Sequence, residues 1–180
     1  VKLVNIDGRE RLLYKPIPIN VCLVRASYAD EYGNCTVHRE IGSLDITAQC
    51  QAAKNSGGIV IVQVEKVVQG GTLDPRLVKI PGIYVDAIVI CENKTDHAQC
   101  QGCEYDGAMT GDFRLPLGSL EAPAMSAKKI IGRRAAMELQ PNTVVNLGIG
   151  IPEYISMVAN EEGIGDYMTL TVEAGPVGGV

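Results

Sequence analysis

The sequence has 180 residues, enough for one domain or for parts of two. Hydrophobic residues make up 46% of it and charged residues 21%, a balance that supports a packed core and argues against a disordered chain. The net charge is −5 and lysine and arginine form no long cluster, which disfavours nucleic acid as a partner because a phosphate backbone requires a positive surface.

Two further features concern the cellular setting. The longest apolar run, residues 57–64, is far too short to cross a bilayer, and the first residues show no signal-peptide pattern. Six cysteines are present, and in a chain with a sizeable core we expect reduced thiols rather than a disulfide framework. The composition therefore indicates a cytoplasmic protein without a membrane partner.

The first half of the chain alternates predicted strands with one helix. Alternating residues around Asp7 and Gly8 predict a β-hairpin over residues 1–14. Ser43 is a candidate cap for a helix over residues 44–55, which Gly57 and Gly58 would end. Apolar, β-branched runs predict further strands, most of them buried. These strands are expected at residues 19–27, 59–68 and 83–90, with a short one at 35–40 and turns at 29–35 and 79–82.

The chain changes character after residue 90. Residues 91–113 are polar and glycine-bearing without periodicity, and two prolines predict a linker at residues 116–126. Ser126 then caps a predicted helix over residues 127–139. A strand at 143–150, a helix at about 152–160 and a strand at 168–172 are expected to follow.

Strands and helices thus alternate on both sides of the linker. That order predicts an α/β fold made of two units with mostly parallel sheets. The sequence begins inside a strand pattern and ends inside a glycine loop, so partner strands would be left unpaired. We therefore expect this chain to be a fragment of a longer polypeptide.

A glycine loop in the second unit is the first candidate site. Gly148 and Gly150 follow a predicted strand and precede a helix, where glycines let a backbone approach a ligand and the helix start presents N–H groups. The dinucleotide fingerprint is not present, because Glu153 occupies the place of its third glycine. Pro152 also removes one N–H donor. The pattern leaves two readings open, a ligand loop and a tight strand-helix turn.

Glu173 is the second candidate. It follows the predicted strand MTLTV and precedes the glycine-rich segment AGPVGG. Functional sites are built where the strands of parallel α/β sheets end, and a carboxylate there can act as a base, a nucleophile or a metal ligand. A solvated loop acid is the alternative, since most acids are exposed.

The third candidate is a metal site in the cysteine-rich loop. Cys91, His97, Cys100 and Cys103 could supply a zinc set, and the Cys100–Cys103 pair has the spacing that zinc sites use. A second ligand pair at similar spacing is missing. We therefore predict a loop with incidental thiols and no structural zinc, which elemental analysis after dialysis would test.

The ordered set of segments resembles the family I coenzyme A transferases. In the second half the resemblance rests on KKIIGRRAAMEL, VVNLGIGIPE, VANEEGI and LTVEAGPVGGV. In the first half it rests on VKLVNIDGRERLLYKPIPINVCLVRASYADEYGN, QAAKNSGGIVIVQVEKVV and VKIPGIYVDAIVI. The likeness is greatest to the single-chain acetate or propionate CoA-transferases, and the cysteine-rich loop stands outside it.

The resemblance implies two similar α/β domains of the CoA-transferase type, each only partly present here. Residues 1–115 would form the later part of the first domain, 116–126 the linker and 127–180 the start of the second. Glu173 would be the catalytic residue. The residues of the neighbouring loops would bind coenzyme A or the acyl group, and they are Asn146, Gly148, Gly150, Pro152, Gly175, Gly178 and Gly179.

The resemblance also implies the reaction. Coenzyme A would pass between a short-chain acyl-CoA and a free acid of the acetate, propionate, butyrate or acetoacetate type, by a ping-pong route through a covalent glutamyl-CoA thioester. Coenzyme A is then a substrate, no cofactor or metal is expected, and the full-length protein would be a homo-oligomer. Two alternatives stay open: a non-catalytic ligand-binding sensor of the same fold, and a folded but inactive fragment. Because the family's later glycine-rich segments are absent here, we expect no transferase activity from the isolated chain.

Overall fold

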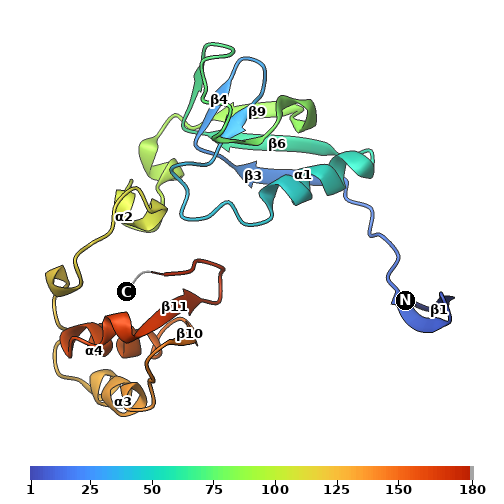
Figure 1. Ribbon diagram of the computed structural model, residues 1–180. Coiled ribbons are helices and arrows are strands. Elements are labelled where there is room, and N and C mark those ends of the chain that lie inside the picture. Colours follow the sequence, from blue (N-terminus) through green and yellow to red (C-terminus); the bar gives the residue numbers. More distant parts are fainter. Residues whose placement is uncertain (179–180) are drawn as a thin grey trace. The chain divides into compact units, whose positions relative to one another are not determined.

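The computed structural model describes residues 1–178, and the chain forms two compact units (Figure 1). The first unit comprises residues 1–38 and 45–97. The second comprises residues 39–44 together with the chain from Ala98 onward. The short segment 39–44 therefore belongs with the second half of the chain, although its sequence neighbours belong to the first.

The predicted hairpin at the start is confirmed. Strands β1 (Lys2–Ile6) and β2 (Arg9–Leu13) pair antiparallel, with Ile6 opposite Arg9. Asp7 and Gly8 between them have φ angles of 52° and 77°. Two successive residues with positive φ are what a two-residue turn needs if its twist is to match that of the strands.

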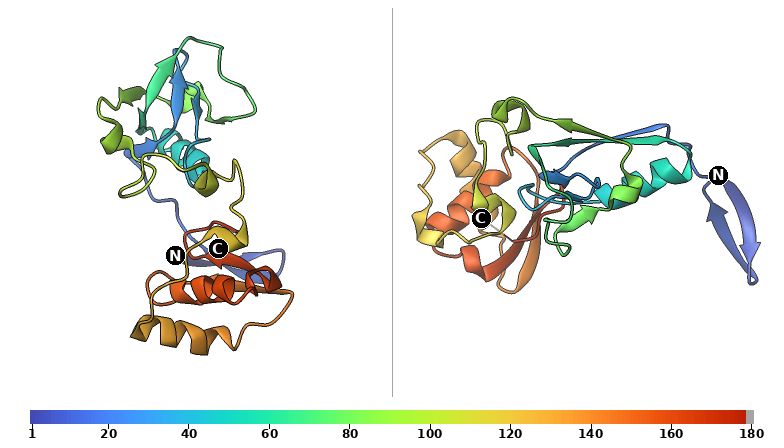
Figure 2. Two further views of the ribbon diagram at one scale, coloured as in Figure 1. Left: turned by 90° about the vertical axis from the view of Figure 1, so that its left-hand side faces the viewer. Right: turned by 90° about the horizontal axis from the view of Figure 1, so that it is seen from above.

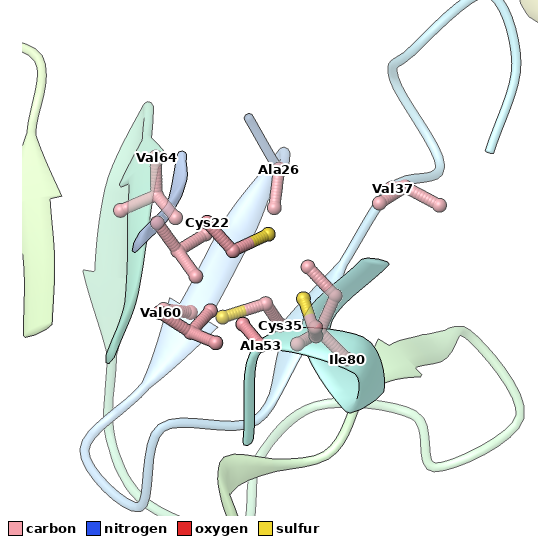
Figure 3. Packing of buried hydrophobic residues seen from close by; sticks show 11 residues of the cluster. Cys22, Ala26, Cys35, Val37, Ala53, Val60, Val64 and Ile80 are labelled. Carbon is pink, nitrogen blue, oxygen red and sulfur yellow. The ribbon is translucent and has the colours of Figure 1, made fainter. Parts of the chain in front are cut away.

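A three-stranded parallel sheet forms the centre of the first unit. Its order is β3 (Val21–Arg25), β6 (Ile59–Val64) and β9 (Ala87–Ile90). Helix α1 (Ile46–Asn55) contributes Cys50 and Ala53 to the buried cluster, which Figure 3 shows from close by. Leu23 is 72% exposed, so within the first unit the sheet is covered on one face only. The expectation of strands buried on both faces is wrong here, because no element of this unit covers the second face.

Three predicted boundaries also need correction. Helix α1 begins at Ile46, and Asp45 rather than Ser43 occupies its N-cap. The Asp45 carboxylate accepts from Gln49 Nε2 at 2.8 Å rather than from a backbone N–H of the first turn. The long strand expected at 59–68 is divided at Glu65 into β6 and β7 (Lys66–Val68), because β7 pairs in a different sheet. The strand expected at 83–90 starts only at Ala87, after a 3-10 helix, η1 (Gly82–Tyr84).

The second sheet of the first unit has four strands, in the order β7, β4 (Tyr28–Asp30), β5 (Cys35–Thr36) and β8 (Val78–Ile80). The buried carboxylate of Asp30 holds the turn that follows β4. It accepts hydrogen bonds from the backbone N–H groups of Tyr32, Asn34 and Gly71 at 3.0, 2.9 and 3.3 Å. Burial works to raise the pKa of Asp30, but these bonds and one from the Asn34 side chain outweigh it and hold that pKa below its usual value.

The second unit contains a parallel strand pair and two packed helices. The elements are α2 (Gly107–Thr110), α3 (Ala127–Ala136), β10 (Thr143–Leu147), α4 (Glu153–Glu161) and β11 (Met168–Val172). Three short 3-10 helices complete the chain: η2 (Lys94–His97) in the first unit, and η3 (Leu117–Ser119) and η4 (Gly165–Tyr167) in the second.

Helices α3 and α4 lie side by side (Figure 2). The predicted cap at Ser126 is confirmed, since its Oγ accepts from the Lys129 N–H at 3.2 Å. A Cβ on Gly132 would lie 2.8 Å from the Tyr154 Cβ, so glycine permits the close approach of the two helices. The buried Lys129 Nζ lies 2.8 Å from Glu161 Oε2, and this ion pair lowers the pKa of Glu161. Ile155 of α4 packs against the buried Leu147, Met168 and Leu170 of β10 and β11, so α4 joins the helix pair to the strand pair.

The predicted fold class is confirmed: the structure is α/β, with parallel pairing in the β3–β6–β9 sheet and in the β10–β11 pair. The four-stranded sheet is mixed, because β5 pairs antiparallel with both β4 and β8. Across residues 1–178, no helix combines the length and apolar character needed to pass through a membrane.

Candidate functional site

The candidate site lies where strands β10 and β11 end. The two strands are parallel, and Leu147 is the register partner of Val172. The next residue along each strand is therefore Gly148 on one and Glu173 on the other. Because the carboxyl ends of parallel strands meet at one edge of the sheet, the glycine loop and the carboxylate that the sequence predicted come together there.

Glu173 stands at the tip of a sharp reversal of the chain. The Gly175 N–H donates to the Val172 carbonyl at 3.0 Å, and the Val172 N–H donates to the Pro176 carbonyl at 3.2 Å. Val177 then forms an antiparallel bridge with Thr171. Strand β11 is thus folded back on itself directly after the glutamate, which holds the backbone of Glu173 between two fixed segments.

The Glu173 side chain is exposed. Among residues 1–178 the structure gives its carboxylate no hydrogen bond and no ion pair. Both oxygens are therefore available to an incoming group, which a structural carboxylate with occupied oxygens would not offer.

Gly175 needs to be glycine for two reasons. Its φ is 118°, a conformation that L residues rarely adopt, and a Cβ on it would lie 2.9 Å from Leu44 Cδ2. Leu44 itself has a φ of 40° and belongs to the segment 39–44 of the second unit. An apolar side chain from the first half of the sequence therefore packs beside the glutamate loop.

Asn146 joins the two strands just before they end. Its Nδ2 donates to Thr171 Oγ1 at 2.9 Å. Asn146 is opposite Thr171 in the register, so the two side chains share one face of the strand pair. Their hydrogen bond fixes the relative position of the two strand ends.

The glycine loop after β10 is held by an acid of its own. The Gly150 N–H donates to Glu153 Oε1 at 2.9 Å, and Gly150 has a φ of 97°. Pro152 occupies the N-cap of α4. Because Glu153 already occupies the Gly150 N–H and adds a negative charge, this loop is a poor receptor for a phosphate. The loop is better suited to the uncharged part of a ligand. Its first residue, Gly148, is the one that faces Glu173 across the two strand ends.

Gly178 and Gly179 are the two predicted site residues that remain. Gly178 donates its N–H to the Leu170 carbonyl at 2.7 Å and has a φ of 88°, so it closes the reversal after Glu173. Gly179 lies outside the described residues.

The four candidate zinc ligands are divided between the two units. Cys91 and His97 belong to the first unit, and Cys100 and Cys103 to the second. Cys91 is half-buried, and its thiol donates to the Asn93 carbonyl at 3.2 Å. In the described part of the chain no three His, Cys, Asp or Glu side chains gather into a group that could hold a metal ion.

Leu44 and Glu153 are the two residues of this site that the sequence patterns missed. Leu44 was expected inside a helix, and nothing local signals a contact with a loop so far along the chain. Glu153 carried a weaker signal: its spacing of three from Gly150 is that of a capping box, although the N-cap of α4 is Pro152.

Comparison with known proteins places these features in a family. Residues 1–90 match the coenzyme A transferase family. Over its whole length the chain is 42% identical to caffeate CoA-transferase of Acetobacterium woodii and 38% identical to acetate CoA-transferase YdiF of Escherichia coli K12. It covers 34% of each of these proteins, so it spans about a third of the curated relatives that it matches.

A solved structure gives the same result. The crystal structure of acyl-CoA transferase YdiF from Escherichia coli O157:H7, in a thioester complex with CoA, superposes with a TM-score of 0.82 at 39% identity. The match covers 99% of this chain and 33% of that one. The chain belongs to the coenzyme A transferase family.

Proposed function

We propose that Glu173 is the nucleophile of a coenzyme A transferase that exchanges coenzyme A between an acyl-CoA and a free carboxylic acid. One observation carries the proposal: an exposed carboxylate without a protein partner follows a parallel strand, in a reversal that fixes its backbone. A nucleophile must be ionised, reachable and held in place, and this position meets the last two requirements.

The proposed reaction has two half-steps. The Glu173 carboxylate attacks the thioester carbonyl of an acyl-CoA, the C–S bond breaks, and an acyl-glutamyl anhydride and a CoA thiolate form. The thiolate then attacks the glutamyl carbonyl of the anhydride, which releases the acid as its carboxylate and leaves a glutamyl-CoA thioester. A second acid runs both steps backwards. The anhydride and the thioester are similarly energetic, so no ATP is consumed.

The residues around Glu173 have supporting roles in this proposal. Asn146 holds the two strand ends together through Thr171, and Gly148 leaves room beside the carboxylate for the acyl group and the thiol arm of coenzyme A. Leu44 supplies an apolar neighbour to the loop. The anhydride and the thioester both react with water, so the site must be shielded from it. Leu44 shields one side of the loop in this proposal, and polypeptide beyond this chain would shield the remainder.

The substrates are proposed as a class. One relative is named for caffeate and another for acetate, and we propose a short-chain acyl group such as acetyl or propionyl for this chain. Coenzyme A is a substrate, and the proposed chemistry needs no cofactor. We also propose the domain division at residues 1–115, 116–126 and 127–180. The homo-oligomer and the cytoplasmic location stay predictions.

A ligand-binding relative without catalysis is the competing function. Such a sensor would have no use for a carboxylate with two free oxygens at the tip of a fixed reversal. A catalytic role uses both features, so we favour the transferase.

The direct test uses a polypeptide that carries this sequence at the length of its relatives, called the full-length polypeptide below. Incubation with acetyl-CoA in the absence of an acceptor acid should accumulate the glutamyl-CoA thioester, and borohydride should reduce that thioester to an alcohol. Peptide mass spectrometry should find the change at Glu173 and nowhere else. Glu153 is the matched control, since it begins α4 directly after the neighbouring loop and already accepts the Gly150 N–H.

Reduction at Glu153 or at another acid would refute the assignment. Binding of acetyl-CoA without any covalent change would instead favour the sensor. The isolated 180-residue chain should show no exchange between acetyl-CoA and propionate.

A further inference from the structure

The cysteine-rich loop, which the proposed reaction does not use, contains two thiols held opposite each other. Cys100 and Cys103 form an antiparallel bridge in which each N–H donates to the other's carbonyl, at 3.3 and 3.1 Å. Gly102 supplies a φ of 82° within the two-residue turn. Outside this bridge the Gln99 N–H donates to the Glu104 carbonyl at 3.1 Å, so the turn is a small, hydrogen-bonded hairpin.

This geometry suits a disulfide. The Cα atoms of a hydrogen-bonded antiparallel pair lie about 5.5 Å apart, within the range of about 4.4–6.8 Å that a disulfide spans. Partial burial and the neighbouring Cys100 and Asp106 raise the pKa of Cys103. The Cys100 Sγ lies 3.9 Å from Met109 Sδ, so a disulfide would replace that contact.

The backbone around the turn is anchored on both sides. The buried Gln99 donates from Nε2 to the Arg39 carbonyl at 3.1 Å and accepts at Oε1 from the Asp106 N–H at 2.9 Å. The Arg39 guanidinium lies 3.8 Å from the centre of the Tyr105 ring. Because these contacts order the turn in advance, linking the two sulfurs requires little further loss of freedom.

We propose that Cys100 and Cys103 are a reversible disulfide site, oxidised by exchange with a low-molecular-weight disulfide RSSR. One cysteine, as its thiolate, attacks RSSR, breaks the S–S bond and expels RS⁻, which leaves a mixed disulfide on the protein. The second cysteine then loses its proton and attacks the protein sulfur of that mixed disulfide, which expels the second RS⁻. The two protein thiols are oxidised, RSSR is reduced to two RSH, and the two protons end on those thiols.

The other cysteines provide internal references. Cys22 and Cys50 are also neighbours, but both are buried in the core of the first unit, part of which Figure 3 shows. Burial raises the pKa of Cys50 to about 11 and that of Cys35 to about 12. Cys50 and Cys35 combine low thiolate content with poor access, and Cys22 is buried, so we expect all three to stay reduced under conditions that oxidise the turn.

The experiment titrates the full-length polypeptide with oxidised and reduced glutathione at mildly alkaline pH. Free thiols are then alkylated, and the protein is digested with trypsin. Cleavage after Lys94 and Arg114 yields a peptide of residues 95–114 that contains Cys100 and Cys103 and no other cysteine. We expect this peptide to lose both alkylation sites together, to be lighter by two hydrogen atoms, and to recover on treatment with dithiothreitol. Its oxidation should become faster as pH rises, because the thiolate fraction increases.

Variants separate the disulfide from the alternatives. Cys100→Ser and Cys103→Ser should each stop at a stable glutathione adduct on the remaining cysteine, at a level at least about tenfold above that of the wild type. Cys91→Ser should change nothing in the 95–114 peptide. The proposal is overturned if both thiols of that peptide remain alkylated in excess oxidised glutathione, if the wild type keeps the adduct, or if oxidation requires prior removal of a metal by a chelator. Equal oxidation of Cys22 and Cys50 would also overturn it.

Discussion

Two carboxylates show how differently the two units use an acid at a strand end. Asp30 ends β4 and is 1% exposed, and its oxygens accept hydrogen bonds from three backbone N–H groups and from the Asn34 side chain. Glu173 follows β11 and is exposed, and the described residues give it no such partner. The first carboxylate is fully used by the fold, whereas the second leaves both oxygens free.

The difference teaches how to tell a structural acid from a reactive one. A buried carboxylate with filled oxygens stabilises its turn and cannot attack a substrate without losing those bonds. A carboxylate with free oxygens adds little to stability, and in the proposed reaction it is free to attack a substrate. Substitutions at the two positions should therefore separate stability from activity.

The largest effect is expected for Glu173→Gln in the full-length polypeptide. The amide keeps the shape but removes the nucleophilic oxygen, so turnover should fall by at least about 10⁴-fold. Because the side chain is exposed, the free energy of unfolding should change by less than about 0.5 kcal/mol. Exchange assays measure the turnover, and urea unfolding measures the stability.

Glu173→Asp, which withdraws the carboxylate by one methylene, should lower turnover by about 10²-fold. Wild-type rates in either Glu173 variant would show that Glu173 is a solvated loop acid.

Gly175→Ala should have the second largest effect. The new Cβ meets Leu44 Cδ2 at 2.9 Å in a backbone conformation with a φ of 118°, so the loop that carries Glu173 must shift. A displacement of about an ångström predicts a loss of about 10²-fold in kcat.

Gly178→Ala is the matched control for Gly175→Ala, since Gly178 has a φ of 88° but no atom of residues 1–178 lies within 4 Å of the added carbon. Its loss should be about tenfold smaller than that of Gly175→Ala. Adding Leu44→Ala to Gly175→Ala should restore part of the rate. Equal losses in the two glycine variants, without such a rescue, would mean that Leu44 does not position the loop.

Asp30→Asn should show the opposite pattern, with stability lost. The amide places an N–H₂ group against donors, so the free energy of unfolding should fall by about 2–3 kcal/mol. The folded pKa of Asp30 lies below its usual value of about 3.9, so its contribution is present above that pH and is lost as pH falls through the folded pKa. Urea unfolding at several pH values should therefore show the difference between wild type and variant shrinking below about pH 4. A difference that stays constant down to strongly acidic pH would mean that the charge of Asp30 does not matter.

Local signals explain which parts of this structure the sequence could predict. The Asp7–Gly8 turn, the Ser126 cap and the position of Glu173 after MTLTV each depend on a few neighbouring residues, and the structure has the turn, the cap and the strand end where the patterns put them. Propensity alone misplaced the start of α1, because the positive φ of Leu44 delays the helix to Ile46.

Long-range contacts explain what the sequence could not predict. The approach of Leu44 to Gly175 and the bond from Asn146 to Thr171 join segments that are distant along the chain, and no periodicity encodes them. The exposure of Leu23 also depends on long-range packing. A β-branched run indicates that a strand is buried, but it does not say which element covers each face of the strand.

The smallest effect concerns Asn146, and a pair of substitutions can define its role. The Asn146 Nδ2 donates to Thr171 Oγ1 at 2.9 Å, so Asn146→Ala and Thr171→Val remove the same bond from its two ends. If Asn146 acts only by holding the strand ends, each variant should lower kcat by about the same factor, roughly tenfold, and the double variant should lose no more than either single one. If the carboxamide also touches the acyl group or coenzyme A, Asn146→Ala should be the more damaging and should raise KM as well. Steady-state kinetics of the three variants distinguish these outcomes, and strictly additive losses would exclude the hydrogen bond as the source of the effect.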